Sequence, residues 1–394
     1  MKKVLLAFSG GLDTSFCVPY LIHEKEMEVH TILVNTGGFS DSELDSIACR
    51  ARQLGSASHL NCDETDTFYQ KGIRYLLFGN ILKNETYPLS VSAERIFQAL
   101  ALVAHARKIG ASAIAHGSTG AGNDQVRFDL VCQVLAPEIE IITPIRALQI
   151  SRREEIEFLK KFGFDFSWEK SKYSINQGLW GTSVGGVETL KSSGILPEEA
   201  WPHQVERVGE EVVAISFEKG EPVAFNGTEM KPVEVIQQIN HLGHLYGIGR
   251  DVHVGDTIIG IKGRVGFEAP AALMLIKAHH LLEKHVLTKW QQYWKKQLSD
   301  WYGMMLHEAQ YLDPVMRNIE RFLEETQERV SGTVEVGLRP YHFSVLACDS
   351  PYDLMKSKFG EYGEINRGFT GGDVLGFTRI LGNQMKIYHS IDHE

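Results

Sequence analysis

The 394-residue sequence has few cysteines, and they follow none of the spacings that mark a metal site or a disulfide framework. The five cysteines stand apart, with no Cys-x-x-Cys pair: Cys17, Cys49, Cys62, Cys132 and Cys348. An odd number of scattered thiols argues against a zinc-binding module and against a disulfide-stapled secreted domain. We therefore expect reduced thiols and a cytoplasmic protein.

The chain also lacks an excess of positive charge and a long apolar run. Its 40 Lys and Arg residues against 50 Asp and Glu residues give a formal net charge of −10, which argues against a large nucleic-acid-binding surface. The run Val4 to Phe8 is too short for a signal-peptide core, and no run approaches the about 20 residues that span a bilayer. Hydrophobic residues still make up 43% of the sequence, enough for real cores. We expect a globular protein with neither nucleic acid nor membrane as a partner.

The first 165 residues alternate strand-like and helical patterns. Short apolar runs typical of buried strands occur at 3–8, 29–34, 111–115 and 139–142, and apolar residues at helical spacing occupy 41–54 and 93–108. This alternation predicts an α/β fold with a doubly wound parallel sheet covered on both faces. Ligands bind such sheets at the carboxyl ends of the strands. We therefore expect three segments to converge there: 9–15, 35–38 and 116–124.

The alternation stops after about residue 166. Strand-like runs at 212–217, 257–261, 333–336 and 343–346 are mixed with helical blocks at 271–285 and 314–328. At this length two domains are expected. We predict a nucleotide-binding domain over 1–166, an α+β domain over 167–365 and a C-terminal extension over 366–394.

Residues 7–15, AFSGGLDTS, directly follow the first expected strand. The segment is not a Walker loop, because it has no lysine to reach terminal phosphates. Its glycines can expose backbone N–H groups, the helix that follows adds a positive end, and Ser9, Thr14 and Ser15 add hydroxyls. The two glycines alone fit an ordinary turn. The full string after a leading strand favours a loop that holds a pyrophosphate group.

This loop resembles the pyrophosphate loop of the N-type ATP pyrophosphatases. More narrowly, five separated motifs resemble those of the argininosuccinate synthases and occur in the same order. They are SGGLDTS at 9–15, YPLSVSAER at 87–95, HGSTGAGNDQVRF at 116–128, YSINQGLWGTS at 173–183 and GIKGRVGFEAP at 260–270. The likeness extends from the N-terminus to at least Pro351.

The resemblance implies a two-step ligation in arginine biosynthesis. The ureido oxygen of citrulline attacks the α-phosphorus of ATP, which gives a citrullyl-adenylate and pyrophosphate. The aspartate amine then displaces AMP and forms argininosuccinate. ATP and Mg²⁺ are the implied cofactors. The second domain would bind substrate and mediate assembly into a homotetramer, with the C-terminal part of the chain embracing a neighbouring subunit.

The resemblance also assigns residues to three ligands. The nucleotide set is Ala7, Phe8, Ser9, Gly10, Gly11, Leu12, Asp13, Thr14, Ser15, Val34 and Gly117. The aspartate set is Thr119, Asn123 and Asp124, and the citrulline set is Tyr87, Ser92, Arg127, Ser174 and Ser183. Asp13 and Asp124 are the catalytic candidates, and no metal ligand is assigned. Taken singly, Asn123-Asp124 fits a turn or helix cap, and Arg127 a surface charge.

The sequence departs from the family pattern where the acceptor substrate is expected. The family segment usually reads GRxDxVENRxxGxKSRGxYETP, and here it is GRDVHVGDTIIGIKGRVGFEAP over 249–270. Gly255 replaces a glutamate that would hold the α-ammonium of citrulline, and Phe267 replaces a tyrosine. Near Tyr87 a usual Gly-Thr-Ser becomes Ser-Val-Ser at 90–92, and Ala121 replaces a lysine near the nucleotide.

Losing a carboxylate that pairs with a substrate cation ordinarily costs about 2–5 kcal/mol of binding. Gly255 and Phe267 therefore predict an acceptor whose α-nitrogen carries an acyl group, acetyl or succinyl. A succinyl carboxylate would need a cation, which Lys262 or Arg264 could supply. A diverged synthase that binds free citrulline through repositioned groups is an alternative interpretation.

Two other classes share the glycine loop. Other adenylating enzymes of this superfamily do not explain the motif at 116–128, and a thiouridine-forming tRNA enzyme needs catalytic cysteines and a basic surface. A non-catalytic nucleotide-binding module would not need the aspartate and citrulline motifs. Release of pyrophosphate from ATP and aspartate, with and without citrulline, separates an enzyme from such a module.

Overall fold

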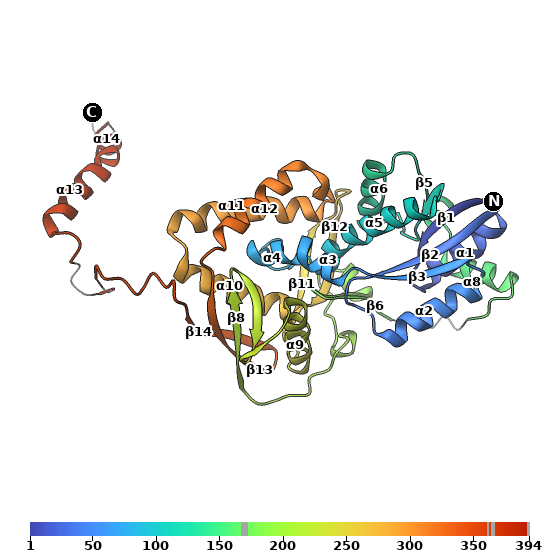
Figure 1. The fold of residues 1–394 in the computed structure, drawn as a ribbon, viewed down its shortest axis with the longest axis horizontal. Coiled ribbons are helices and arrows are strands. Elements are labelled where there is room, and N and C mark those ends of the chain that lie inside the picture. The colour runs from blue at the N-terminus through green and yellow to red at the C-terminus, as the bar shows by residue number, and fades with distance from the viewer. Residues whose placement is uncertain (121, 167–171, 361, 364–366, 392–394) are drawn as a thin grey trace.

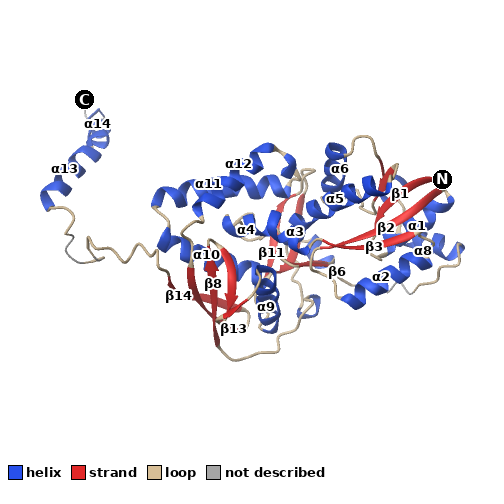
Figure 2. Ribbon diagram, in the orientation of Figure 1, coloured by secondary structure: helices blue, strands red, loops and turns tan. Residues whose placement is uncertain are grey.

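The computed structural model describes the whole chain except residues 121, 167–171, 361, 364–366 and 392–394. Its first part is a five-stranded parallel sheet in the order β3-β2-β1-β4-β5. The strands are β1 (Lys2–Ala7), β2 (Met27–Asn35), β3 (Ser58–Asp63), β4 (Ala113–Ala115) and β5 (Glu140–Ile142). The predicted α/β fold with a doubly wound parallel sheet is confirmed (Figure 2).

Helices cover both faces of this sheet because its strands are apolar on both sides. In β1, Leu5 packs into the larger hydrophobic core, whereas Val4 and Leu6 pack into a second core on the opposite face. This is the alternation that a strand imposes on successive side chains. The covering helices are α1 (Leu12–His23), α2 (Asp41–Gln53), α5 (Ser90–Ile109), α6 (Asp124–Leu135), α7 (Pro144–Leu148) and α8 (Arg152–Lys161).

Strand β1 lies at the point where the chain reverses its direction across the sheet. It pairs with β2 on one side and with β4 on the other, so the segments that follow β1 and β4 flank one crevice. In open α/β sheets this switch point is where ligands bind. Capping boxes at Ser40 and Ser151 fix where α2 and α8 begin, each with a glutamate three residues later.

The rest of the chain forms two antiparallel sheets and their helices. One sheet has the order β10-β9-β8-β13-β14 and the other β11-β12-β7-β6. The strands are β6 (Ser174–Gly178), β7 (Gly181–Gly185), β8 (Glu211–Glu218), β9 (Glu221–Phe225), β10 (Thr228–Glu229), β11 (Arg250–Asp256), β12 (Lys262–Glu268), β13 (Gly332–Arg339) and β14 (His342–Asp349). The helices are α9 (Pro232–Leu245), α10 (Pro270–Val286), α11 (Lys289–His307) and α12 (Pro314–Thr326), with 3-10 turns at Val187–Leu190, Glu198–Ala200 and Gln310–Leu312.

The strand predicted over 257–261 is wrong, because this segment is the turn between β11 and β12. Gly260 adopts φ +83°, which a strand does not allow. The Thr257 hydroxyl donates to the Ile261 carbonyl and accepts from its N–H, which closes the turn. The hairpin β6–β7 and the helices α9 and α11 have no counterpart among the predicted elements.

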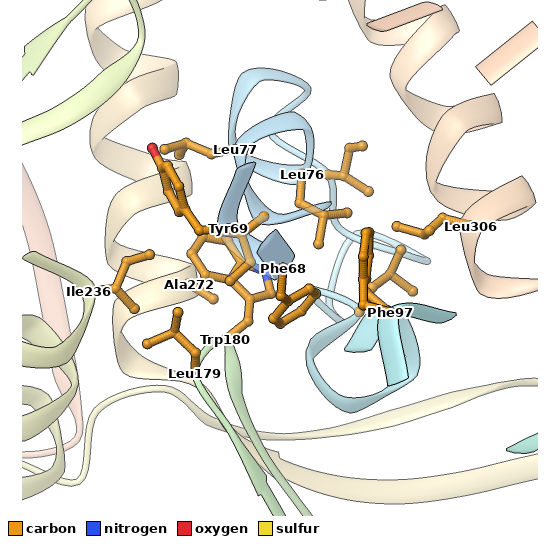
Figure 3. Packing of buried hydrophobic residues seen from close by; sticks show 14 of the residues in the cluster. Phe68, Tyr69, Leu76, Leu77, Phe97, Leu179, Trp180, Ile236, Ala272 and Leu306 are labelled. Carbon is orange, nitrogen blue, oxygen red and sulfur yellow. The ribbon is translucent and has the colours of Figure 1, made fainter. Parts of the chain in front are cut away.

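The two parts of the chain share one hydrophobic core. After β3 the chain runs through α3 (Thr65–Phe68), a π-helical turn (Tyr69–Ile73) and α4 (Arg74–Phe78) into the second part. Figure 3 shows Phe68 and Phe97 from the first part beside Trp180 and Ala272 from the second. Trp180 is fully buried, and its Nε1 donates to the Pro88 carbonyl at 3.0 Å. The start of α5 is thereby fixed against the hairpin β6–β7.

The chain ends in two helices that lie away from the body (Figure 1). They are α13 (Gly371–Leu381) and α14 (Asn383–Ile391), and neither buries any residue. Phe377 and Ile380 are 62% and 79% exposed. Within the described part of the chain, no helix combines the length and apolar character needed to cross a bilayer.

Candidate active site

The glycine loop joins β1 to α1 and presents backbone donors to the crevice. Gly11 is the N-cap of α1 in an extended conformation, and no side chain in the described part of the chain caps the first N–H groups of the helix. The first α1 hydrogen bond runs from the Ser15 N–H to the Gly11 carbonyl at 2.9 Å. The N–H groups of residues 12–14 are therefore left for an anion, which the positive end of α1 also attracts.

A cavity of about 790 Å³ opens above this loop. The three segments expected to converge all contribute to it, through Ser9, Gly38 and Ser118 among others. Most of the predicted nucleotide set lines it: Ala7, Phe8, Ser9, Gly11, Leu12, Asp13, Thr14, Val34 and Gly117. Thr119 and Asp124 of the aspartate set line it too.

Gly10 and Ser15 belong to the loop but do not line this cavity. Gly10 adopts φ +75°, and its carbonyl accepts from Arg50 Nη1 at 2.5 Å on the side of α2. The Ser15 hydroxyl is fully buried and has no hydrogen-bond partner in the described structure. Gly10 therefore shapes the loop, and the Ser15 hydroxyl lies outside the space open to phosphate.

A second cavity of about 330 Å³ adjoins the first and is built from both parts of the chain. Of the predicted substrate residues it contains Tyr87, Ser92, Asn123, Arg127 and Ser183. Ser174 instead lines the larger cavity. Strands β11 and β12 form the opposite wall, which includes Gly255 and Arg264. We call this the acceptor cavity and the larger one the nucleotide cavity.

Arg95 and Asp124 line both cavities and mark their junction. Arg95 Nε donates to Asp124 Oδ2 at 3.1 Å, and Arg127 Nη1 donates to Asp124 Oδ1 at 2.8 Å. Burial works to raise the pKa of Asp124, but Arg95 and Arg127 outweigh it, so the pKa lies below its usual value. Asp124 is thus an anion held by two guanidinium groups.

Arg127 is not a surface charge, because it is only 3% exposed. Its Nε and Nη2 both donate to the His307 carbonyl, at 3.2 and 3.0 Å. His307 is the last residue of α11, so this helix fixes the guanidinium in the acceptor cavity. Burial, followed by Arg127, lowers the pKa of His307 to about 3, which leaves the imidazole neutral.

Glu94 supports the same junction from α5. Arg95 Nη1 donates to Glu94 Oε1 at 2.9 Å, and the Thr36 hydroxyl donates to Glu94 Oε2 at 2.9 Å. Burial raises the pKa of Glu94 to about 7. Arg95 and Glu94 were missed as site residues, although they close the motif at 87–95. Asn176 and His307 were missed as well, and His307 had no sequence signal.

Two family models together match nearly the whole chain. The argininosuccinate synthase N-terminal HUP domain matches residues 3–165, and the argininosuccinate synthase C-terminal domain matches residues 173–388. The chain belongs to the argininosuccinate synthase family. The synthase of Methanocaldococcus jannaschii is 37% identical to it over 98% of both chains. The synthase of Dictyoglomus thermophilum is 36% identical over 98% of this chain and 97% of its own, and that of Xanthomonas campestris 35% identical over 99% of both.

Membership of the argininosuccinate synthase family makes the chain an enzyme, a ligase that forms a carbon–nitrogen bond. The family joins aspartate to citrulline and uses ATP. The nucleotide cavity, with its free helix N-terminus, agrees with ATP use.

The acceptor cavity differs from the argininosuccinate synthase pattern at the predicted positions. A Cβ built on Gly255 would lie 2.6 Å from His253 Nε2, so the imidazole fills the space of the family's glutamate. Phe267 is fully buried and packs edge-on against Tyr87, with ring centroids 5.3 Å apart, so it supports the wall from behind. Of the other two predicted differences, the Ser-Val-Ser segment at 90–92 contributes Val91 and Ser92 to the cavity lining, and Ala121 lies outside the described residues.

Proposed function

We propose that this enzyme ligates aspartate to a citrulline whose α-nitrogen is acylated, through an adenylate intermediate. The observation that carries the proposal is the charge of the acceptor cavity. Its two acids are already paired, Asp124 with Arg95 and Arg127, and Asp256 with Lys262 at 2.7 Å. With Asp124 assigned to the aspartate amine and Asp256 paired with Lys262, the cavity lining offers a free α-ammonium no carboxylate of its own, whereas an amide carries no charge to compensate.

The two cavities suit the two chemical steps. ATP in the nucleotide cavity would set its leaving pyrophosphate on the N–H groups of residues 12–14. A citrulline in the acceptor cavity would point its ureido group toward the junction at Arg95 and Asp124. Its oxygen forms a bond to the α-phosphorus as the bond to pyrophosphate breaks. Holding the reactants in line is worth up to about 7–11 kcal/mol of the barrier.

Aspartate would bind between Thr119, Asn123 and Asp124, and its amine would then attack the adenylated carbon as AMP leaves. Asn123 Oδ1 accepts from the Ile258 N–H at 2.9 Å, which ties the hairpin β11–β12 to this segment. Arg95 and Arg127 hold Asp124 as an anion, the form that can accept a hydrogen bond from the amine.

Magnesium fits the nucleotide cavity as a phosphate-bound ion. Mg²⁺ commonly uses one or two carboxylates together with substrate phosphates and water, and Asp13 is a carboxylate of the loop that lines the cavity. In the described structure the one cluster of three potential ligands is His203, His244 and Glu268, and none of these lines either cavity. We propose Asp13 as a ligand and neutralisation of phosphate charge as the role of the ion.

The identity of the acyl group depends on the cations within reach. Lys262 is paired with Asp256, and Arg264 Nη1 donates to the carbonyls of Glu188 and Lys191 at 2.9 and 2.8 Å. Lys262 already has a carboxylate partner and Arg264 is held through Nη1, so an acetyl group, which needs no cation, fits these contacts without changing them. Lys83 does not line the cavity but lies close enough to His253 and Asp256 to influence both, and it would be the cation available to a succinyl group.

The test is kcat/KM for citrulline, N-acetylcitrulline and N-succinylcitrulline at saturating ATP and aspartate. One lost charged contact corresponds to a preference of about tenfold or more for an acylated form, since ~1.4 kcal/mol is a factor of ten. Equal or better use of free citrulline would contradict the proposal and leave an ordinary synthase with an altered wall.

We also propose a homotetramer in which α13 and α14 contact a neighbouring subunit. The support is their exposed apolar side chains, which no part of the described chain covers. Light scattering of the native protein should give four times the chain mass of 44.2 kDa. A mass of one chain would refute the assembly, and a chain truncated after residue 360 should lose it.

A further inference from the structure

We infer that His253 recognises the acyl carbonyl of the acceptor, with its Nε2–H donating the hydrogen bond. The inference rests on the proposed function and assigns its selectivity to one side chain. In this chain a neutral donor stands where the family has a carboxylate.

The geometry of β11 places His253 at the acceptor. His253 and Gly255 are two residues apart on one strand, so their side chains point to the same face. A Cβ built on Gly255 would lie only 2.6 Å from His253 Nε2. The imidazole can therefore occupy this position only because residue 255 is a glycine. His253 is 6% exposed as a residue, and its ring stacks on Tyr87, with centroids 5.0 Å apart and planes at 23°. Its position is therefore fixed by packing.

Neither ring nitrogen of His253 has a hydrogen-bond partner among the described residues. Nδ1 is enclosed within the protein, whereas Nε2 is not, and His253 lines the acceptor cavity. A neutral imidazole carries one N–H and one lone pair. An enclosed N–H without an acceptor is rarer in proteins than an unsatisfied acceptor. We therefore assign the proton to Nε2, the nitrogen that a ligand can reach.

The surrounding charges keep this imidazole neutral. Burial, followed by the nearby Lys83, lowers the pKa of His253. Arg95, Arg127 and Arg264 line the same cavity. Its two acids are paired, Asp124 with Arg95 and Arg127, and Asp256 with Lys262. A neutral Nε2–H donor can bond to an amide carbonyl, but it has no lone pair for an ammonium. In this tautomer the same atom thus favours the acylated substrate over the ammonium.

The experiment compares His253→Phe, which keeps a ring on Tyr87 but removes the donor, with His253→Gln, which places an amide N–H at a similar reach. The readouts are kcat/KM for citrulline and N-acetylcitrulline, and calorimetric binding of N-acetylcitrulline without ATP. His253→Phe should weaken binding and kcat/KM for N-acetylcitrulline about 3–10-fold more than kcat/KM for citrulline, through KM. His253→Gln should retain most of the preference. His342→Phe, at an exposed histidine of β14, is the matched control.

The outcomes separate the inference from the proposed function. If the wild-type enzyme favours acylated citrulline and His253→Phe keeps that preference undiminished, the assignment of His253 is wrong and the proposed function stands. If the wild-type enzyme favours free citrulline, the proposed function fails, whatever the variants do. An equal loss for both substrates in a variant with a native circular dichroism spectrum also overturns the assignment, since it indicates a packing role.

Discussion

The nucleotide cavity and the acceptor cavity meet at Arg95 and Asp124 but are built in opposite ways. The phosphate end of the nucleotide cavity is made by consecutive residues of one loop, and its donors are backbone N–H groups at the start of α1. The acceptor cavity is made by side chains from α5, α6, α11 and both strands of the hairpin β11–β12. In the nucleotide cavity, phosphate binding depends little on side-chain identity, because a backbone N–H donor is present whichever side chain the residue carries. The second design makes substrate preference depend on which side chains line the acceptor cavity.

The largest expected effect comes from Gly11→Val. A Cβ at this position meets only the Ser9 hydroxyl at 3.5 Å, so the fold should survive. The branched side chain would stand over the N–H groups that hold the leaving group, and loss of such a donor costs about 10²–10³-fold in rate. ATP–pyrophosphate exchange in the presence of the acceptor measures the adenylation step.

Gly209→Val, at a glycine with nothing within 4 Å of a built Cβ, is the control for this experiment. Full exchange activity in Gly11→Val would contradict the assignment of the loop as the pyrophosphate site. It would also remove the contrast between the two cavities.

Arg95→Gln should have the next largest effect. The substitution removes a single guanidinium group that pairs with two acids. Asp124 keeps only Arg127 as a partner, and the buried Glu94 loses the cation beside it. Breaking a buried, hydrogen-bonded charge pair costs about 2–5 kcal/mol, so kcat/KM should fall at least about 30-fold for aspartate and acceptor alike. Arg107→Gln, which breaks an exposed pair with Glu138, should change neither. A loss confined to one substrate would show that the cavities act separately.

Glu155→Gln should stabilise the protein at high pH only. Burial, followed by Asp13, raises the pKa of Glu155 to about 8. A carboxyl with a raised folded-state pKa binds its proton more tightly in the folded protein, so stability is lost as pH rises from about 4.5, the ordinary value, to about 8. The amide removes this cost.

At pH 8.5 we expect Glu155→Gln to melt roughly 2–4 °C above wild type, the shift that about 1 kcal/mol gives in a domain of 150–250 residues, and to match it at pH 5. Glu157→Gln on the same helix, in an exposed pair with Arg153, is the control. A constant difference across the pH range would rule out titration of Glu155 as its cause.

The smallest expected effect distinguishes Ser174 from Ser183, two serines that the sequence assigned to the same citrulline set. Ser183 lines the acceptor cavity and Ser174 the nucleotide cavity. Ser183→Ala should raise KM for the acceptor about 2–10-fold, the worth of one neutral hydrogen bond, and Ser174→Ala should leave that KM unchanged. The opposite pattern would mean that the acceptor extends across the junction.

The glycine loop and the parallel sheet could be predicted because each follows from local pattern. Alternating strands and helices define the sheet, and its topology alone brings residues 9–15, 35–38 and 116–124 together. The acceptor cavity could not be predicted in this way, because His307 enters it from α11. That helix has no clear apolar face, since Trp290, Trp294 and Trp301 are each more than half exposed.

Local pattern also misled at one place. Residues 257–261 are rich in β-branched side chains and were predicted to be a strand, but Gly260 and the Thr257 hydroxyl make them a turn. The proposed role of His253 could not be predicted from local pattern either. Its residue type and its spacing from Gly255 are visible in the sequence, but its stacking on Tyr87 is a tertiary contact.

The packing of His253 against Gly255 restricts how substrate preference can evolve. A glutamate introduced at 255 meets a ring that Tyr87 holds in place, so the single change from the present sequence is blocked. Removing the imidazole first gives an intermediate with neither donor nor carboxylate. The two positions are therefore expected to show strong epistasis, with each substitution harmful alone and the pair tolerated. On the proposed role of His253, a change of acceptor therefore requires substitution at both positions.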